Sequence, residues 1–222
     1  MQEFRLILGA FAATALALGM LTGCGPTAMP NVQVGLPSYP LPSPAATSTG
    51  PVVRVQPFVD RVTRPHGGTL TVFDMSLGNI VFDPQIATVL EDAVVAELSA
   101  AGMKVVLDRD DVSPSPAADF LVTGAIDEFV VSTTNSMIDW DVKLEMRVCL
   151  GLFRQDGTSV RTLPPVSAIL NEKTMARPGG EIIGRLALRH YARFREALSA
   201  PEGLIPSIRN AAAPSARKDG PR

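Results

Sequence analysis

The chain has 222 residues, of which 46% are hydrophobic, 19% charged and 5% aromatic. Its formal net charge of −2 argues against a globally basic nucleic-acid-binding protein, and its two cysteines cannot build a disulfide framework or a four-thiolate zinc site. The 19 prolines and 18 glycines are an excess that belongs outside a packed core. The composition therefore predicts one small α/β or α+β domain with extensions.

The N-terminus is predicted to be a signal peptide. Residues 4–22 are apolar except for Arg5 and two threonines, and the run ends in Leu21-Thr22-Gly23-Cys24. A cationic start, an apolar core and small residues before a cleavage point are typical of secretory signals. The alternative is a plain membrane anchor, because about 20 apolar residues can cross a bilayer. We interpret residues 1–23 as the signal peptide.

The end of this run resembles the bacterial lipobox, in which a leucine and two small residues, here Leu21, Thr22 and Gly23, precede an invariant cysteine. The resemblance implies that Cys24 carries a diacylglyceryl group and, after cleavage in front of it, an N-acyl chain such as palmitate. Gly25 stands where an aspartate would signal retention at the inner membrane. The resemblance therefore implies an outer-membrane lipoprotein on the periplasmic face, anchored stably by several acyl chains.

A proline-rich tether is predicted to follow the lipidated cysteine. Seven of the 27 residues from Gly25 to Pro51 are proline, none is charged, and no apolar periodicity persists. This composition is typical of an extended linker. Residues 24–51 are assigned to the tether and residues 52–200 to the globular domain.

The domain is predicted to open with a β-α-β unit. Val52–Val55 is a strand signal, and Asp83-Pro84 predicts a helix start, with the acid as N-cap and proline at the first helical position. Gly102 is expected to end that helix, and Met103–Leu107 to form the next strand. The helix is expected to bury apolar residues at helical spacing, namely Ile86, Val89, Leu90, Ala93, Val94 and Leu98.

Residues 138–152 show the clearest pattern of the chain. Apolar residues at even positions alternate with polar residues such as Asp139, Asp141 and Lys143, which predicts a long strand with one dry face. Asp156-Gly157 predicts a hairpin turn, and Pro164-Pro165 places the returning strand at an edge or breaks it. The dry face comprises Ile138, Trp140, Val142, Leu144, Met146, Val148, Leu150 and Leu152.

A second helix is predicted over residues 180–198, followed by a partly disordered tail over residues 201–222. Its wet side carries Arg185, Arg189 and Arg193, which are candidate partner-binding residues. Its buried stripe is expected to contain Ile183, Leu186, Ala187, His190, Phe194 and Leu198.

These elements predict an α/β fold in the form of an α+β two-layer sandwich. A mixed, mostly antiparallel sheet of about five strands would carry two main helices on one face, in the order β-α-β-β-β-β-α. Val55-Gln56-Pro57-Phe58, the helix ending in Gly102, and Ala118–Gly124 before a long hairpin resemble the YajG family of small bacterial lipoproteins. They also resemble auxiliary lipoproteins of ABC-type lipid transporters and curli-secretion channel subunits. The resemblance implies a protein that assembles with other envelope proteins, and it offers no known catalytic residues to carry over.

No catalytic or metal-binding motif is present in the sequence. Residues 108–111, Asp-Arg-Asp-Asp, lack the spacing of a calcium loop and are interpreted as a solvated turn. His66 lies in a glycine-rich loop, and His190 is interpreted as a core histidine with one hydrogen-bond partner. Neither a nucleophile elbow nor a phosphate-binding loop occurs. We therefore expect no enzymatic activity, no metal, no cofactor besides the acyl chains, and no small-molecule substrate.

Cys149 and the charge distribution leave alternatives open. Cys149 is interpreted as a passive, half-buried thiol, although Arg147 two residues away would favour reactivity.

Residues 74–141 contain 13 acidic and 2 basic residues, whereas residues 171–222 contain 10 basic and 5 acidic residues. This polarity is consistent with head-to-tail self-association, with a basic helix that meets an acidic partner, or with two solvated faces.

Three functions are weighed. The first is a non-enzymatic accessory or scaffold lipoprotein of an envelope complex for transport, secretion or surface-appendage assembly. Its partners would be the membrane through its lipid and other envelope proteins or further copies of itself, but not nucleic acid. The second is an oligomeric channel that inserts its long hairpin into the outer membrane. The third is an enzyme using Asp127, Glu128, Asp139 and Asp141. It is disfavoured because adjacent acids on a strand point to opposite faces, and because Asp139 and Asp141, which share a face, are interpreted as part of a solvent-facing row.

Overall fold

The computed structural model describes residues 31–36, 50–62, 69–72, 75–108, 117–136 and 138–213, with the backbone alone for 69–72 and 75–78. The predicted signal peptide, the lipobox with Cys24, His66 and residues 109–111 lie outside these ranges. Within them, no helix combines the length and the apolar character that a membrane span requires.

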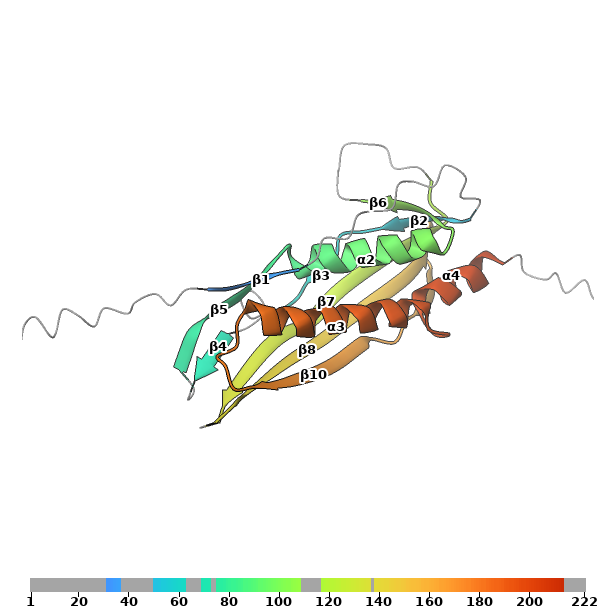
Figure 1. The fold of residues 1–222 in the computed structure, drawn as a ribbon. Coiled ribbons are helices and arrows are strands. Elements are labelled where there is room, and N and C mark those ends of the chain that lie inside the picture. The colour runs from blue at the N-terminus through green and yellow to red at the C-terminus, as the bar shows by residue number, and fades with distance from the viewer. Residues whose placement is uncertain are drawn as a thin grey trace, which may run out of the picture. The chain divides into compact units, whose positions relative to one another are not determined.

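A mixed seven-stranded sheet forms the main layer of the domain (Figure 1). Its order is β10-β8-β7-β2-β6, with β3 beside β7 and β9 beside β8. The β10, β8, β7 and β9 pairings are antiparallel, whereas β2 runs parallel to both β6 and β7. The strands are β2 (Val52–Val55), β3 (Val59–Asp60), β6 (Lys104–Leu107), β7 (Phe120–Asn135), β8 (Trp140–Arg154), β9 (Ser159–Thr162) and β10 (Val166–Thr174).

Three further strands form a smaller sheet in the order β1-β5-β4. The strand β1 (Val32–Gly35) pairs in parallel with β5 (Met75–Asp83), and β4 (Thr69–Val72) pairs with β5 in the antiparallel sense. The short strand β1 also contacts α3 (Gly180–Ser199), so the small sheet is joined to the helical layer.

Two helices cover one face of the main sheet (Figure 1). The helix α2 (Ile86–Ala100) packs on β2 and β6, and α3 packs on β8 and β10. The predicted two-layer architecture with a mostly antiparallel sheet and two main helices is confirmed. The sheet is larger than expected because the short strands β3 and β9 also pair into it.

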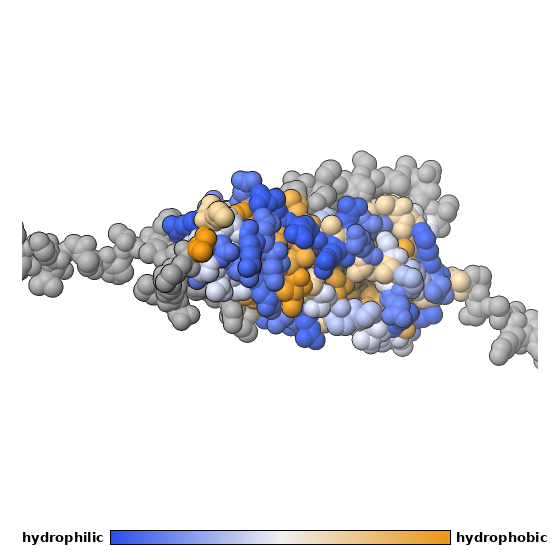
Figure 2. All heavy atoms as spheres, turned by 60° about the horizontal axis from the view of Figure 1, so that its bottom comes forward, coloured by the Kyte–Doolittle hydropathy of each residue, from blue (hydrophilic) through white to orange (hydrophobic). Residues whose placement is uncertain are grey.

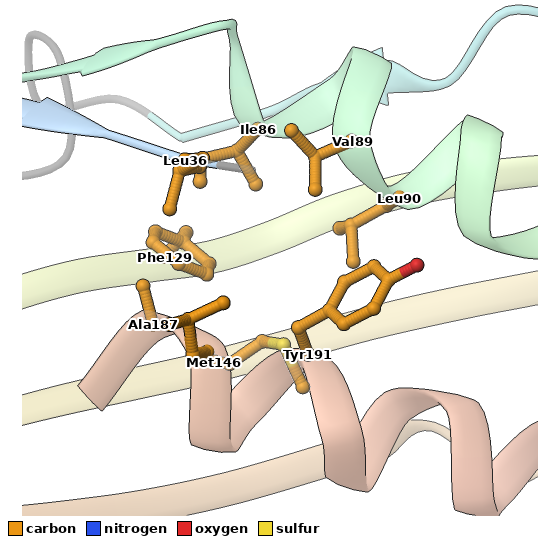
Figure 3. A pocket seen from close by; sticks show the side chains of 9 residues that line it. Leu36, Ile86, Val89, Leu90, Phe129, Met146, Ala187 and Tyr191 are labelled. Atoms are coloured by element: carbon orange, nitrogen blue, oxygen red, sulfur yellow. The ribbon is translucent and has the colours of Figure 1, made fainter. Parts of the chain in front are cut away.

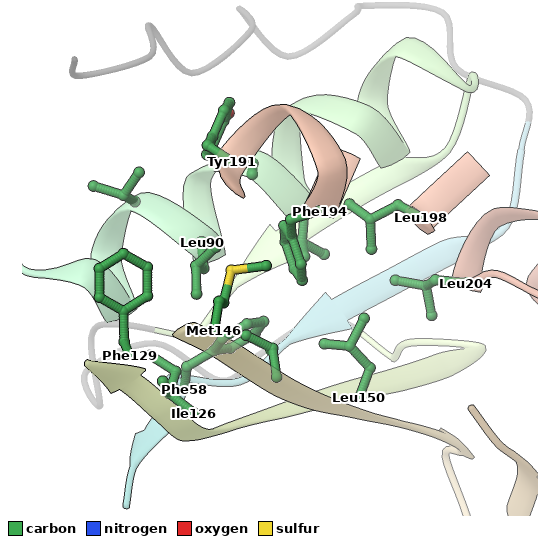
Figure 4. Close-up of a cluster of buried hydrophobic side chains, with 14 of the residues drawn as sticks. Phe58, Leu90, Ile126, Phe129, Met146, Leu150, Tyr191, Phe194, Leu198 and Leu204 are labelled. Atoms are coloured by element: carbon green, nitrogen blue, oxygen red, sulfur yellow. The ribbon is translucent and has the colours of Figure 1, made fainter. Parts of the chain in front are cut away.

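The hydrophobic core fills the space between these layers (Figure 4). In β8 the predicted dry face is confirmed from Val142 onward, but Ile138 precedes the strand and is exposed. All six residues of the predicted α3 stripe are buried, including Phe194, which is fully buried. The buried residues of β8 are Val142, Leu144, Met146, Val148, Leu150 and Leu152.

Glycine and proline residues lie at the ends of several helices and strands, as the sequence predicts. Gly102 follows the α2 C-cap with φ of 85°, a left-handed conformation that suits glycine. Gly157 adopts φ of 82° in the turn between β8 and β9. Pro164 and Pro165 separate β9 from β10, because proline lacks the N–H that a continuous ladder needs.

The predicted tether, residues 24–51, contains the strand β1. The prediction that the folded domain starts only at residue 52 was therefore wrong. Val32 to Gly35 form β1, and Val34 is fully buried in the core. A four-residue strand that pairs with only one neighbour is too short to produce a recognisable alternation among prolines.

The start of α2 also differs from the prediction. Asp83 is the last residue of β5 and pairs with Gly35, and its carbonyl accepts a hydrogen bond from Leu36 N–H. The Asp83-Pro84 peptide bond is cis, and the helix begins at Ile86 with Gln85 as an N-cap that makes no side-chain bond. Pairing with the small sheet therefore outweighs the local capping signal at Asp83.

Part of the predicted C-terminal tail is a helix. The helix α4 (Leu204–Ala212) buries Leu204, Ile205 and Ile208 against α3 and β8. Arg209 on its exposed side donates a hydrogen bond of 3.1 Å to the carbonyl of Ala101, the C-cap of α2. The assignment of residues 201–222 as a tail was therefore wrong for this stretch.

Candidate functional site

The three predicted partner-binding arginines lie along α3, but the structure separates their roles. Arg185 bridges Glu172 on β10 at 2.6 Å and Glu181 on its own helix at 2.9 Å. The Glu172 carboxylate, followed by Glu181, raises the pKa of the Arg185 guanidinium above its ordinary value. Arg185 therefore joins α3 to the sheet, and its charge is already paired within the chain.

Arg189 and Arg193 are exposed and form no ion pair with any residue that the structure describes. They follow Arg185 at intervals of four residues, so they lie on neighbouring turns of the same side of α3. Within the described part of the chain, these two guanidinium groups are therefore cations without an ion-pair partner.

The strand beneath this side of α3 is the last strand of the sheet. β10 pairs only with β8 within the described part of the chain, so its outer edge presents backbone N–H and C=O groups without a strand partner. Pro164-Pro165 lies before one end of this edge, and Lys173 lies near the other end. Proline and lysine at an edge strand discourage nonspecific pairing with the strands of other chains. Ile169, between them, is 56% exposed.

A groove lies where α3, α4 and the β9–β10 junction meet. Its volume is about 450 Å³, and its walls are mostly apolar, including Pro165, Ala168 and Ala197. Arg193 lines the groove together with Val166, whereas Arg185 bonds to Glu172 near the other end of β10. The helix therefore runs antiparallel to β10, with Arg189 between these two points.

We call the combination of Arg189, Arg193, the outer edge of β10 and this groove the α3–β10 surface. Figure 2 turns the β10 side of the molecule toward the viewer and shows hydrophilic residues beside apolar ones on this face. Two arginine side chains, a strand edge with backbone N–H and C=O groups, and an apolar groove thus lie within the length of one strand. That combination can bind an extended polypeptide.

The face of the sheet that the helices leave uncovered carries a second polar cluster. Cys149 is half-buried and its thiol lies 3.1 Å from Asp127 Oδ2, with Arg147 and Arg61 also close to that carboxylate. Burial and the neighbouring Asp127 raise the pKa of the Cys149 thiol, which outweighs the opposing effect of Arg147. This environment favours the thiol over the reactive thiolate.

The statement that Asp127 and Glu128 point to opposite faces was wrong. The β7 register shifts between Ile126 and Glu128, so Asp127 is an extra residue in the strand. Such a bulge interrupts the alternation of side chains, and both acids lie on the uncovered face, beside Cys149 and opposite Arg147. Asp127 meets the Cys149 thiol and the guanidinium groups of Arg147 and Arg61 there, which makes a polar surface cluster.

His190 is a core histidine with one hydrogen-bond partner, as predicted. It is fully buried, and its Nε2 lies 2.8 Å from the carbonyl oxygen of Leu144. Burial chiefly lowers the pKa of the imidazole, and Arg193 and Arg189 on the same helix add to this effect. A neutral ring that donates from Nε2 fits this position.

A small apolar cavity lies between α2 and α3 (Figure 3). It has a volume of about 20 Å³ and is lined by Leu36, Ile86, Phe129 and Tyr191, among others. This is room for about one water molecule, and apolar walls do not hold one. Among the described residues no group of three or more His, Cys, Asp or Glu side chains is placed to hold a metal ion.

No protein-family model and no curated protein matches this sequence. The fold is similar to that of protein XCC0632 from Xanthomonas campestris, a member of family DUF330, with 11% identity, coverage of 81% of this chain and 97% of that one, and a TM-score of 0.47. It is similar to a PelC dodecamer from Paraburkholderia phytofirmans, at 16% identity, 71% and 92% coverage and a TM-score of 0.37.

Lipoprotein GNA1162 from Neisseria meningitidis is also similar, with 13% identity, 64% and 98% coverage, and a TM-score of 0.32. Solved structures with a similar fold thus include lipoproteins.

Proposed function

We propose that this chain is a non-enzymatic, lipid-anchored accessory subunit of a bacterial envelope complex, acting on the periplasmic face of the outer membrane. The α3–β10 surface is the observation that carries the proposal, because it offers two cations without an ion-pair partner and a strand edge without a strand partner among the residues that the structure describes. The lipobox-like Leu21-Thr22-Gly23-Cys24 supports the anchoring, and Gly25 supports the outer membrane.

The channel alternative is less well supported by the hairpin itself. One face of β7 and β8 packs on the helices, and the other face of β8 carries Asp141, Lys143, Glu145 and Arg147. An arginine or lysine on a lipid-exposed face costs up to about 2–4 kcal/mol at the bilayer midplane, and an aspartate or glutamate costs less.

Lipidation is tested by replacing Cys24 with alanine in cells that express the full chain. We expect the wild-type protein to sediment with membranes and to incorporate an alkynyl palmitate label, and the Cys24→Ala variant to do neither. A Cys149→Ala variant serves as the matched control and should behave like wild type. Incorporation of the label by the Cys24→Ala variant would refute the anchor.

The accessory role is tested by chemical cross-linking in intact cells followed by affinity isolation. Wild-type protein is expected to capture a defined envelope protein, and charge reversal at Arg189 and Arg193 is expected to remove that species. A Lys104→Glu variant, altered at the opposite edge strand β6, is the control and should retain it. Recovery of the wild-type chain alone, under conditions that preserve other envelope assemblies, would contradict an accessory role.

A further inference from the structure

We propose that the α3–β10 surface binds an extended, acidic segment of the partner protein, which adds to the sheet as a strand beside β10. The inference rests on the proposed function and states which chemistry that function uses. The partner segment would carry acidic residues at alternate positions, followed by an apolar residue on the same face. Its backbone would supply the hydrogen bonds, and its side chains the specificity.

The internal pair between Arg185 and Glu172 shows how such recognition works. Glu172 lies on the helix-covered face of β10, opposite Val142 of β8, and reaches Arg185 at 2.6 Å. A strand added outside β10 would lie about 4.8 Å farther out, with alternate side chains turned toward the same layer. Carboxylates at those positions would meet Arg189 and Arg193 in the way that Glu172 meets Arg185.

The spacings of helix and strand agree. Arg189 and Arg193 are separated by about 6 Å along the axis of α3, because a helix rises about 1.5 Å per residue. Two residues on the same face of a strand are about 6.6 Å apart. Acidic side chains separated by one residue therefore fit the two arginines in succession.

The groove provides a binding position for a third side chain of the segment, beyond the two that meet Arg189 and Arg193. It begins at Arg193 and extends along Ala197 toward Leu204, between α3 and the start of β10. Its volume of about 450 Å³ leaves room for a large apolar side chain. Glu202 also lines it, so the side chain in the groove should carry no negative charge. For a segment that runs antiparallel to β10, the recognised pattern is thus acid–x–acid–x–apolar.

Charge also decides against a second copy of this chain as the occupant. Antiparallel pairing of two β10 edges about a two-fold axis would bring both α3 helices to the same side of the joined sheet. Arg189 and Arg193 of the two copies would then face one another, and Glu172, the acidic residue on this face of β10, is already paired with Arg185 of its own chain. Like charges brought together in this way oppose association.

The test measures binding of a fluorescein-labelled synthetic peptide to the mature lipidated protein in detergent micelles, by fluorescence anisotropy. The peptide contains aspartates at two alternate positions, a leucine at the next position of that face, and valine or threonine elsewhere. We expect the combined Arg189→Glu and Arg193→Glu substitutions to weaken binding about tenfold, and Lys104→Glu to leave it unchanged. A peptide with lysine in place of both aspartates should bind at least about tenfold more weakly than the acidic one.

Strand addition is separated from simple charge attraction by a peptide with the same side chains but N-methyl groups on two adjacent central residues. Adjacent residues point their N–H groups to opposite edges, so this peptide cannot pair along either edge. We expect it to lose at least about tenfold in affinity, and equal binding of both peptides would overturn strand addition. A concentration-dependent dimer in sedimentation that the acidic peptide dissociates would make a second copy the occupant and overturn the proposal.

The two proposals fail in different ways. If the peptide does not bind but the cross-linking experiment still captures an envelope protein, the accessory role stands and the acidic-strand inference is wrong. If the peptide binds as expected but no partner is captured in cells, the surface chemistry stands and the accessory role is wrong.

Discussion

A buried polar side chain holds a loop of this domain against the sheet. Glu91 on α2 is 5% exposed and accepts a 2.8 Å hydrogen bond from the backbone N–H of Phe58. The Phe58 ring in turn covers Gly124 of β7, where an added Cβ would lie 2.4 Å from the ring. One carboxylate thus positions the connection between β2 and β3 over the sheet.

Replacing Glu91 tests this contact. The Glu91→Leu variant leaves the Phe58 N–H buried without its acceptor and should lose about 1–3 kcal/mol of unfolding free energy. The Glu91→Gln variant keeps an acceptor oxygen and should lose less. Urea unfolding followed by circular dichroism measures both, and a Leu variant at least as stable as the Gln variant would show that the hydrogen bond is unimportant.

His190 predicts a pH dependence of stability. Burial lowers the pKa of its imidazole in the folded state, so as the pH falls the unfolded chain takes up the proton first. The stabilisation from neutral His190 is therefore complete above a pH of about 6.5 and is lost as the pH falls below that value.

The His190→Gln variant isolates this contribution, because glutamine retains an N–H donor for the Leu144 carbonyl but does not titrate. We expect the difference in unfolding free energy between wild type and variant to shrink as the pH is lowered from about 7.5 to 5. Urea unfolding at matched ionic strength measures it. A difference that stays constant or grows would show that His190 is not held neutral.

Secondary-structure elements were predictable where a long periodic pattern coincided with burial. β8 and α3 satisfy this condition, and their faces follow from the spacing of residues such as Leu144 and Phe194. β1 and the bulge at Asp127 do not, because their conformation depends on pairing with distant strands. The α4 helix did have a local signal, the spacing of Leu204, Ile205 and Ile208, but Pro201 and the alanine-rich end obscured it.

The α4 helix gives a prediction at this scale. A Cβ on Gly203 would lie 2.2 Å from the carbonyl oxygen of Ala197, a backbone atom that cannot move freely. Gly203→Ala should therefore displace the start of α4 and destabilise the protein by about 1–3 kcal/mol.

Gly179 provides the matched control, because it also precedes a helix but has nothing within 4 Å of an added Cβ. Gly179→Ala should change stability by less than about 1 kcal/mol. Thermal unfolding and hydrogen exchange across residues 204–212 distinguish the two variants. Equal effects of the two substitutions would mean that the close approach at Gly203 does not constrain α4.

At the scale of the molecule, the candidate site brings together the arginines of α3, the edge of β10 and the groove. The arginine spacing on α3 is visible in the sequence, and Pro164-Pro165 indicates an edge or a break. That Arg185 is already engaged with Glu172, whereas Arg189 and Arg193 make no ion pair within the described residues, requires the packing of α3 on β10. The groove likewise depends on α4, so it could not be predicted while residues 204–212 were assigned to a tail.

The strand β1 has a consequence for how far this protein can work from a membrane. Because the folded domain begins at β1, only the seven residues from Gly25 to Asn31 separate Cys24 from that strand, instead of the 27 residues up to Pro51. At about 3.5 Å per residue, even a straight chain covers about 25 Å. In the lipid-anchored form that we propose, the start of β1 would therefore stay within about 25 Å of the attachment point, and the domain would meet its partners near the bilayer surface.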